Sequence, residues 1–100
     1  MAETSATIAL WGQQTFGSLS SPMAALERAA LEMDELREAI ARPETPPKEM
    51  AMEAADVVIL LHRLCGELGY DLNALVDEKM RLNRDRQWTV AGDGTGQHQE

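Results

Sequence analysis

The apolar residues of this chain recur at the three- and four-residue spacing of amphipathic helices, and no stretch alternates convincingly as a strand would. The pattern predicts four helices, over about residues 5–15, 22–42, 47–68 and 72–88. Ser21–Pro22 is typical of a helix start, whereas Gly17 and Gly69 lie where helices are expected to end. Short connections between such helices favour antiparallel neighbours, so we expect an all-α fold, an antiparallel helical bundle of about four helices per chain.

The last ten residues lack this periodicity. Residues 91–100 are rich in glycine and polar residues, which is typical of a flexible terminal segment. A chain of 100 residues corresponds to one domain, so the sequence predicts a helical domain over residues 1–90 and a flexible C-terminal tail over residues 91–100. No stretch approaches the roughly 20 apolar residues of a membrane span, and the first residues lack the basic region of a signal peptide. We therefore expect a cytoplasmic protein with no membrane partner.

Two acidic residues of the second helix lie beside its apolar stripe. The stripe is predicted to consist of Leu26, Ala29, Met33, Leu36 and Ile40. At about 100° per residue, Glu32 lies about 40° from Leu36 around the helix, and Glu35 lies about 60° further out. Glu32 and Glu35 therefore share one face near the edge of the core.

The third helix carries a second pair of acids with the same spacing. Glu53 and Asp56 are the only acids in residues 50–65, a segment that is otherwise nearly all apolar. A carboxylate that is desolvated in such surroundings is costly unless it is paired or bound to a metal. A helix that is apolar on nearly all sides also indicates a buried interface, so we expect oligomerisation to complete the bundle.

Two interpretations of these acids stay open. They could belong to narrow solvent-exposed faces, and an ion pair with Arg28, four residues earlier, could satisfy Glu32. Alternatively, the repeated spacing on consecutive antiparallel helices would bring the carboxylates into a small volume, where their mutual repulsion calls for cations. Oxygen ligands of this kind suit Mg2+ or Mn2+. We favour the metal site, whose expected ligands are Glu32, Glu35, Glu53 and Asp56.

The fourth helix places cations on its apolar face. Lys79, Asn83 and Arg86 fall within about 60° of one another, on the side that also carries leucines and a valine. Cations that point toward a core need an acidic partner or a bound anion. These residues could pair with acids of the neighbouring helices or extend to solvent. They could equally hold phosphate oxygens, which we favour because the opposite side of the helix already carries the residues expected at a surface.

The overall charge and the missing motifs narrow the function further. A formal net charge of −8 argues against sequence-independent nucleic-acid binding, which needs a basic surface. No GxxxxGK[ST] loop is present, so the chain is not a P-loop enzyme, and a single cysteine allows no intrachain disulfide. Trp11 and Phe16 could stack on a nucleotide base or pack in the core.

These motifs together resemble a known family. GluMetAspGlu (32–35) and GluAlaAlaAsp (53–56) look like the paired ExxE and ExxD motifs of the MazG-like, all-α NTP pyrophosphatase superfamily, which also includes dimeric dUTPases. Residues 79–88 resemble the Lys…Asn..Arg.Trp segment that follows the acidic helices in MazG-type members. The opening over residues 11–17 is similar to a subgroup with dATP/dGTP diphosphohydrolase activity, including the phage MazZ enzymes. One position departs from the pattern, because Leu31 stands where many members have a second glutamate.

The resemblance implies hydrolysis between the α- and β-phosphates of a nucleoside triphosphate, which gives a nucleoside monophosphate and pyrophosphate. The four acids would hold Mg2+ or Mn2+, and Glu32 or Glu35 would act as the general base. The expected phosphate-binding residues are Lys79, Asn83 and Arg86, and the candidates for base binding are Trp11 and Phe16. Family members of this length associate, so a homodimer or homotetramer that acts on dATP or dGTP is expected.

Other functions stay open. Within the enzyme class they are a house-cleaning hydrolase of damaged or non-standard nucleotides and a dUTPase-like enzyme. Outside it, the chain could be a non-catalytic helical protein-interaction module. The sequence also leaves open the base and sugar preference and the number of ions, because helical periodicity does not place the residues that shape the pocket.

Overall fold

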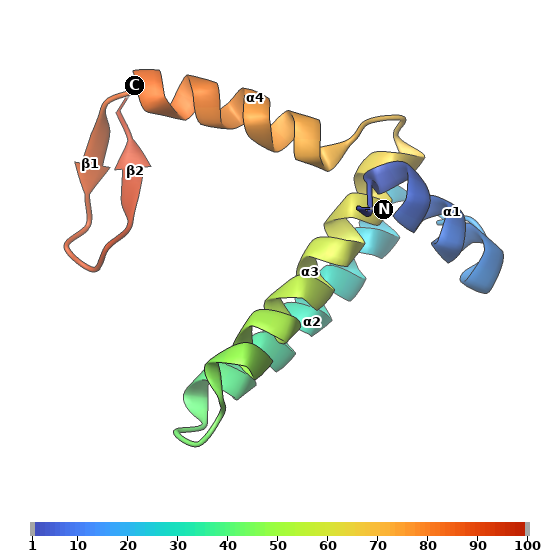
Figure 1. The fold of residues 1–100 in the computed structure, drawn as a ribbon, viewed down its shortest axis with the longest axis horizontal. Coiled ribbons are helices and arrows are strands. Elements are labelled where there is room, and N and C mark those ends of the chain that lie inside the picture. The colour runs from blue at the N-terminus through green and yellow to red at the C-terminus, as the bar shows by residue number, and fades with distance from the viewer. Residues whose placement is uncertain (1, 100) are drawn as a thin grey trace.

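The computed structural model describes residues 2–99 and consists mainly of four helices (Figure 1). They are α1 (Ser5–Phe16), α2 (Pro22–Ala41), α3 (Pro47–Glu67) and α4 (Leu72–Asp85). The predicted all-α fold with four helices is confirmed, and the first three helices begin and end close to their expected positions. Among residues 2–99, no helix is both long enough and apolar enough to cross a membrane.

Local sequence signals explain where the helices begin. Thr4 and Thr7 form a reciprocal capping box at the start of α1, in which each side chain accepts a hydrogen bond from the other residue's backbone N–H. Pro22 and Pro47 occupy the first position of α2 and α3, where a missing N–H breaks no helical hydrogen bond. Gly17 follows α1 with a φ of 88°, a conformation that favours glycine.

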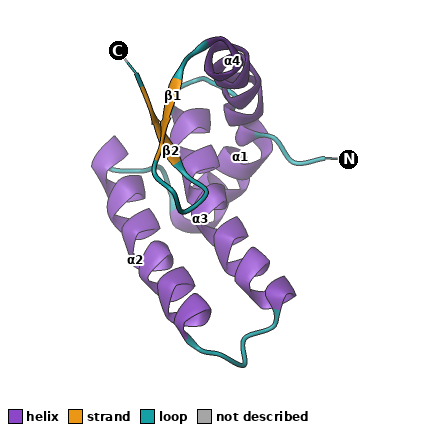
Figure 2. Cartoon of the chain, turned by 90° about the vertical axis from the view of Figure 1, so that its left-hand side faces the viewer, coloured by secondary structure: helices purple, strands orange, loops and turns teal. Residues whose placement is uncertain are grey.

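Helices α2 and α3 form an antiparallel hairpin (Figures 1 and 2), and α2 buries only small side chains. The buried residues of α2 are Ala25, Ala29 and Ala39. Alanine allows two helix backbones to approach closely, so this face packs within the chain although larger apolar residues are present. Of the predicted stripe on α2, Ala29 is buried and Leu36 half-buried within the chain, whereas Leu26, Met33 and Ile40 are 52%, 44% and 57% exposed.

Helix α1 packs across the C-terminal half of α3. Gly66 permits the closest approach, because a Cβ atom there would lie 2.4 Å from the carbonyl oxygen of Ser5. The Ser5 side chain is completely buried, and its Oγ is 2.8 Å from Nδ1 of His62, which is also buried. The two helices are therefore joined by a buried polar contact as well as by close packing.

Helix α4 leaves the other three helices. Asp71 accepts a hydrogen bond from the Ser5 N–H at 3.0 Å, and the N–H of Leu72 donates to the Ser5 Oγ at 2.7 Å. Beyond this junction α4 projects away from the α2–α3 pair and has no buried residue (Figures 1 and 2). The radius of gyration, 15.8 Å, exceeds the roughly 13 Å of a compact domain of this length. Completion of the bundle by oligomerisation stays a prediction.

A short hairpin follows α4, and it was not predicted. Strands β1 (Trp88–Val90) and β2 (Gly96–His98) pair antiparallel, with Trp88 opposite His98. The expectation that the fourth helix continues to Trp88 is therefore wrong, because α4 ends at Asp85. Trp, Thr and Val in β1 favour a strand, and Gly92 and Gly94 in the turn both have a φ of 97°. The division into a domain over residues 1–90 and a flexible tail stays a prediction, and Met1 and Glu100 lie outside the described residues.

Candidate metal and nucleotide site

Three of the four predicted acids converge between α2 and α3. Glu32, Glu35 and Glu53 each place a carboxylate oxygen within 4.8 Å of the others. Glu32 and Glu35 lie one turn apart on α2, and Glu53 reaches the same space from the antiparallel α3. Glu32 and Glu53 are half-buried, whereas Glu35 is exposed. The antiparallel pairing of α2 and α3 therefore brings Glu53 next to two glutamates that precede it by 18 residues or more in the sequence.

The chemistry of this cluster fits a divalent cation. The Oε2 atom of Glu53 is buried and has no hydrogen-bond partner among the described residues. The pKa of Glu35 is raised, first by a hydrogen bond shared with the Glu32 carboxyl group and then by repulsion from Glu32. Partial desolvation and the charge of Glu53 raise this pKa further, and Arg28 opposes them. Mg2+ or Mn2+ prefers oxygen ligands of this kind, and its charge would relieve the repulsion among them.

Asp56, the fourth predicted ligand, lies next to this cluster rather than in it. It is exposed and follows Glu53 by one turn on the same side of α3. Its side chain lines a pocket of about 610 Å³ that Glu32 and Glu35 also line. The structure thus brings all four acids to one region but only three within the distance of a shared ion, and the role of Asp56 stays a prediction.

This larger pocket, which we call the nucleotide pocket after the ligand predicted from the sequence, has a charged and an apolar part. The charged side chains are Arg28, Glu32, Glu35, Asp56 and Arg63. The apolar wall consists of Phe16, Leu19, Ala24, Ala25, Ile59 and Leu60. Its volume lies within the range of about 300–1,000 Å³ that is usual for small-molecule sites. With a cation held by the acids, the arrangement can accept a ligand with one anionic and one apolar end.

Two arginines of the pocket have different surroundings. The Nη2 atom of Arg28 is 3.3 Å from Oε1 of Glu32, and its side chain is 60% exposed. Arg63 is buried, pairs with Oε2 of Glu67 at 2.9 Å and donates a hydrogen bond to the carbonyl of Gly17. The predicted ion pair between Arg28 and Glu32 is therefore present, and it accompanies the acidic cluster rather than replacing it.

The buried pair Arg63–Glu67 fixes the loop that forms one wall of the nucleotide pocket. Oε1 of Glu67 accepts a hydrogen bond from the N–H of Leu19 at 3.0 Å, and Arg63 holds Gly17. The Arg63 side chain passes close to Gly12, where an added Cβ would lie 2.7 Å from its Nε. Sequence reasoning missed this role, although an Arg–Glu pair at four-residue spacing on an apolar helix is a signal that could have found it.

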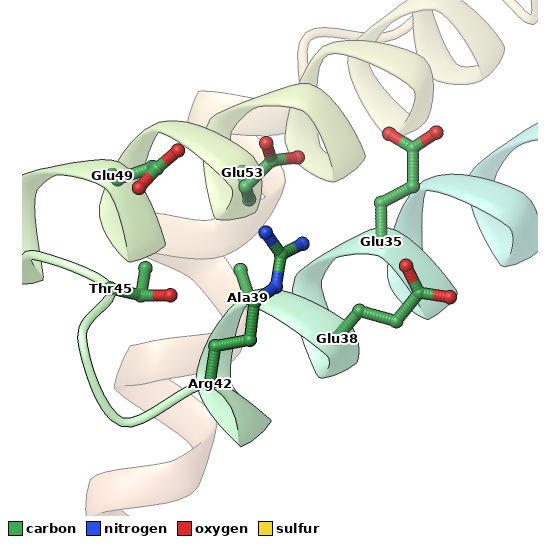
Figure 3. Close-up of a pocket in the computed structure, with 7 residues that line it drawn as sticks. All are labelled: Glu35, Glu38, Ala39, Arg42, Thr45, Glu49 and Glu53. Atoms are coloured by element: carbon green, nitrogen blue, oxygen red, sulfur yellow. The ribbon is translucent and has the colours of Figure 1, made fainter.

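A second, smaller pocket opens on the other side of the acidic cluster (Figure 3). It has a volume of about 220 Å³, and Glu35 and Glu53 line it as well. Figure 3 shows Glu49 on α3, Glu38 on α2 and Arg42, the residue that follows α2, around this space. These three residues were not predicted as site residues, because their positions on the helices look like ordinary solvent-exposed faces.

The predicted phosphate-binding residues lie elsewhere within the chain. Lys79 and Asn83 are on α4, and Arg86 directly follows its last residue; α4 projects away from the α2–α3 pair (Figure 1). Lys79 is exposed, while Nη1 of Arg86 is 3.5 Å from Oδ1 of Asn83. None of the three lines the nucleotide pocket or the smaller pocket. A single chain therefore does not bring them to the acids, and their role stays a prediction.

The two aromatic candidates for base binding contact each other at the end of α1. The rings of Trp11 and Phe16 meet edge to face with centroids 5.6 Å apart. They are 57% and 71% exposed, so packing in the core of one chain does not account for either of them. Phe16 lines the nucleotide pocket, whereas Trp11 lines a separate hollow with Glu3, Ile8 and Ile59. Base binding by either residue stays a prediction.

Comparison with known proteins adds one informative similarity. No family model matches the sequence, and no curated protein matches it. Among solved structures, the chain is similar to the cyanophage S-2L MazG-like pyrophosphohydrolase bound to dGDP and three catalytic Mn2+ ions per active site. The two are 29% identical with a TM-score of 0.72, over 96% of this chain and 89% of that one. The predicted resemblance to MazG-like all-α enzymes is therefore confirmed.

Proposed function

We propose that this chain is a metal-dependent nucleotide pyrophosphohydrolase that converts a (deoxy)nucleoside triphosphate to the monophosphate and pyrophosphate. The observation that carries the proposal is the convergence of Glu32, Glu35 and Glu53 within 4.8 Å, beside a pocket of about 610 Å³. The similarity to a MazG-like pyrophosphohydrolase over nearly the whole chain supports it. A docking module has no need of a buried glutamate oxygen without a partner.

Glu32, Glu35 and Glu53 would hold Mg2+ or Mn2+, with Asp56 available from the same side of α3. When bound, the cation would polarise the phosphate and lower the pKa of a bound water. Glu35 or Glu32 would accept the proton from the attacking water.

The proposed substrates are dATP and dGTP. This preference follows the likeness of residues 11–17 to dATP/dGTP diphosphohydrolases, and the similar cyanophage enzyme was solved with dGDP. The apolar wall beside Phe16 offers a surface on which a purine can stack, while the phosphates lie toward the acids. A dUTPase-like enzyme and a hydrolase of damaged or non-standard nucleotides are the rival specificities. The cytoplasm remains the predicted location.

The proposed enzyme is a homodimer or homotetramer. Because Lys79, Asn83 and Arg86 lie away from the acids of their own chain, a second copy would have to place them near the phosphates. The unburied α4 and the exposed large apolar residues of α2 provide surface for such a copy. There Lys79 and Arg86 would stabilise the charge that develops on the leaving pyrophosphate.

The proposal is tested by incubating the purified chain with each nucleoside triphosphate in the presence of Mg2+ or Mn2+ and identifying the products. We expect monophosphate and pyrophosphate in equal amounts, with the highest kcat/KM for dATP or dGTP. Preferential cleavage of dUTP or of an oxidised nucleotide would support the rival specificities instead. If correctly folded protein released no pyrophosphate from any nucleotide and divalent ions left its Tm unchanged, the interaction-module alternative would stand.

A further inference from the structure

Arg28 is the arginine of the nucleotide pocket that the fold does not hold in place. Its Nη2 lies 3.3 Å from Oε1 of Glu32, and its side chain is 60% exposed while that of Glu32 is 15% exposed. An ion pair with one partner so exposed contributes little to stability, so Arg28 can exchange its partner at small cost. Glu32 is also one of the three acids whose oxygens converge. The resting partner of Arg28 is therefore a predicted metal ligand.

The other cations near the acids are less suited to bind a ligand in this pocket. The Arg63 side chain is 10% exposed and is engaged by Glu67 and by the carbonyl of Gly17. Arg42 lines the smaller pocket on the other side of the cluster. The cations of α4 line neither pocket of their own chain. Within residues 2–99, Arg28 is thus the cation that faces the nucleotide pocket without being fixed by the fold.

The charge balance of the site gives Arg28 a second partner. A divalent cation held by the acids would cancel much of the charge that Glu32 presents to Arg28. A triphosphate in the same pocket would bring several anionic oxygens, and a planar guanidinium binds such oxygens in a bidentate manner. Binding of the cation together with the triphosphate would therefore weaken the Arg28–Glu32 ion pair and offer Arg28 a phosphate as its new partner.

We propose that Arg28 is a phosphate-binding residue, held by Glu32 in the free protein and passed to a substrate phosphate when the acids bind their cation. This inference rests on the proposed function. It assigns the first phosphate contact to the same chain as the acids, whereas Lys79 and Arg86 would come from a second copy. Arg28 thereby links filling of the metal site to capture of the nucleotide.

The test compares Arg28→Gln and Arg28→Lys with a charge-matched control, Arg81→Gln, which lies on α4 outside both pockets. Affinity for a non-hydrolysable α,β-imido deoxynucleoside triphosphate is measured by calorimetry in the presence of Mn2+. We expect Arg28→Gln to weaken it about tenfold or more, as for a lost charge-assisted hydrogen bond, and Arg28→Lys to recover part of it. A separate measurement, the rise in Tm with Mn2+ alone, should be at least as large in Arg28→Gln as in the unmodified chain, because Arg28 no longer competes with the cation for Glu32.

Two results would overturn the inference. One is an affinity for the triphosphate analogue that Arg28→Gln leaves equal to that of Arg81→Gln. The other is a loss of the Mn2+-induced rise in Tm in Arg28→Gln, which would mean that Arg28 organises the acids rather than the phosphates. Failure of the proposed function looks different, because then neither the unmodified chain nor Arg81→Gln would release pyrophosphate from any nucleotide.

Discussion

Glu53 is the residue whose surroundings say most about the site. It lies in the mostly apolar middle part of α3, and its Oε2 is buried without a hydrogen-bond partner among the described residues. A buried acceptor that is left unsatisfied costs about 1–3 kcal/mol, more if it is charged. Two further carboxylates, those of Glu32 and Glu35, lie close by, and their repulsion makes a charged Glu53 still less favourable. Such a position is unfavourable in a merely structural residue and favourable in a cation ligand.

Replacement of Glu53 by Gln should separate metal binding from folding. Glu53→Gln removes a ligand and relieves repulsion, so we expect a Tm equal to or above that of the unmodified chain without divalent ions. With Mn2+, the unmodified chain should gain stability and the variant should gain far less. Pyrophosphate release should fall by about a hundredfold or more. Glu27→Gln, an exposed change on α2, is the control, and an equal Mn2+ response in both variants would contradict the assignment.

Asp71 gives a prediction about pH. Its pKa is lowered, first by the hydrogen bond from the Ser5 N–H, with further help from the Ala74 N–H and the charge of His62, against partial desolvation. A carboxyl group whose pKa is lower in the folded state stabilises the fold above its unfolded pKa of about 3.9, and this contribution is lost as pH falls through the folded pKa. Asp71→Asn should therefore lower the free energy of unfolding near neutral pH.

Denaturant titrations from pH 7 to pH 2 check this prediction. The difference between Asp71→Asn and the unmodified chain should be largest above pH 5 and should shrink toward zero at the acid end. Asp77→Asn, an exposed change on the same helix, is the matched control and should show no such trend. A difference that does not vary with pH would mean that Asp71 acts through packing alone.

At the scale of elements, the two ion pairs with four-residue spacing offer a direct comparison of burial. The side chains of Arg63 and Glu67 are 10% and 14% exposed, whereas Arg28 is 60% exposed in its pair with Glu32. Removing one member of a buried pair leaves an uncompensated charge, so Arg63→Ala should destabilise the protein by about 3 kcal/mol. Arg28→Ala should cost about 0–1 kcal/mol.

Urea unfolding of the two alanine variants measures both values. Arg63→Ala should also weaken nucleotide affinity, because the loop that carries Gly17 and Leu19 loses its attachment to α3. Glu67→Gln tests the other member of the buried pair, because glutamine keeps an acceptor for the Leu19 N–H but lacks the charge that pairs with Arg63. Equal destabilisation by Arg63→Ala and Arg28→Ala would show that burial does not distinguish the two pairs.

The helices were predictable because their signals are local. Caps such as Thr4 and prolines at first positions act within one turn, so the sequence places helix ends well. The β1–β2 hairpin depends on pairing between residues 88–90 and 96–98, which periodicity does not register. On α2 the apolar positions form two overlapping faces, one of alanines and one of larger residues. Hydrophobicity alone favoured the larger ones, whereas the close approach to α3 selects the alanines.

The candidate site divides in the same way. The repeated three-residue spacing on two antiparallel helices favoured one cluster of four acids, of which Glu32, Glu35 and Glu53 meet and Asp56 lies beside them. The smaller pocket depends on how the connection between α2 and α3 folds, and the contact of Arg63 with Gly17 depends on the packing of α1 against α3. Neither arrangement follows from short-range spacing in the sequence. The basic residues of α4 were predicted to face a core. In one chain they face none, because α4 extends beyond the junction at Ser5.

At the scale of the whole molecule, the projection of α4 away from the acids predicts that each active site combines the acids of one copy with the α4 of another. If α4 acts on the acids of a second copy, two inactive variants should complement each other. Glu53→Gln lacks a working acid cluster but keeps its α4, and the double variant Lys79→Ala/Arg86→Ala has the opposite defect. In a mixed oligomer, the acids of one chain and the cations of the other would form an intact site. Equal mixing into random dimers should restore about a quarter of the activity, because half the dimers are mixed and each of these has one intact site.

Co-expression of the two variants with different affinity tags allows the mixed species to be purified, and light scattering gives its mass. Pyrophosphate release is then compared among the mixed species, each variant alone and the unmodified chain. If α4 instead folds back onto the acids of its own chain, every site in the mixed oligomer carries one defect, and no activity returns. Recovery therefore requires that α4 reach the acids of another copy, which is the arrangement that its projection away from the α2–α3 pair favours.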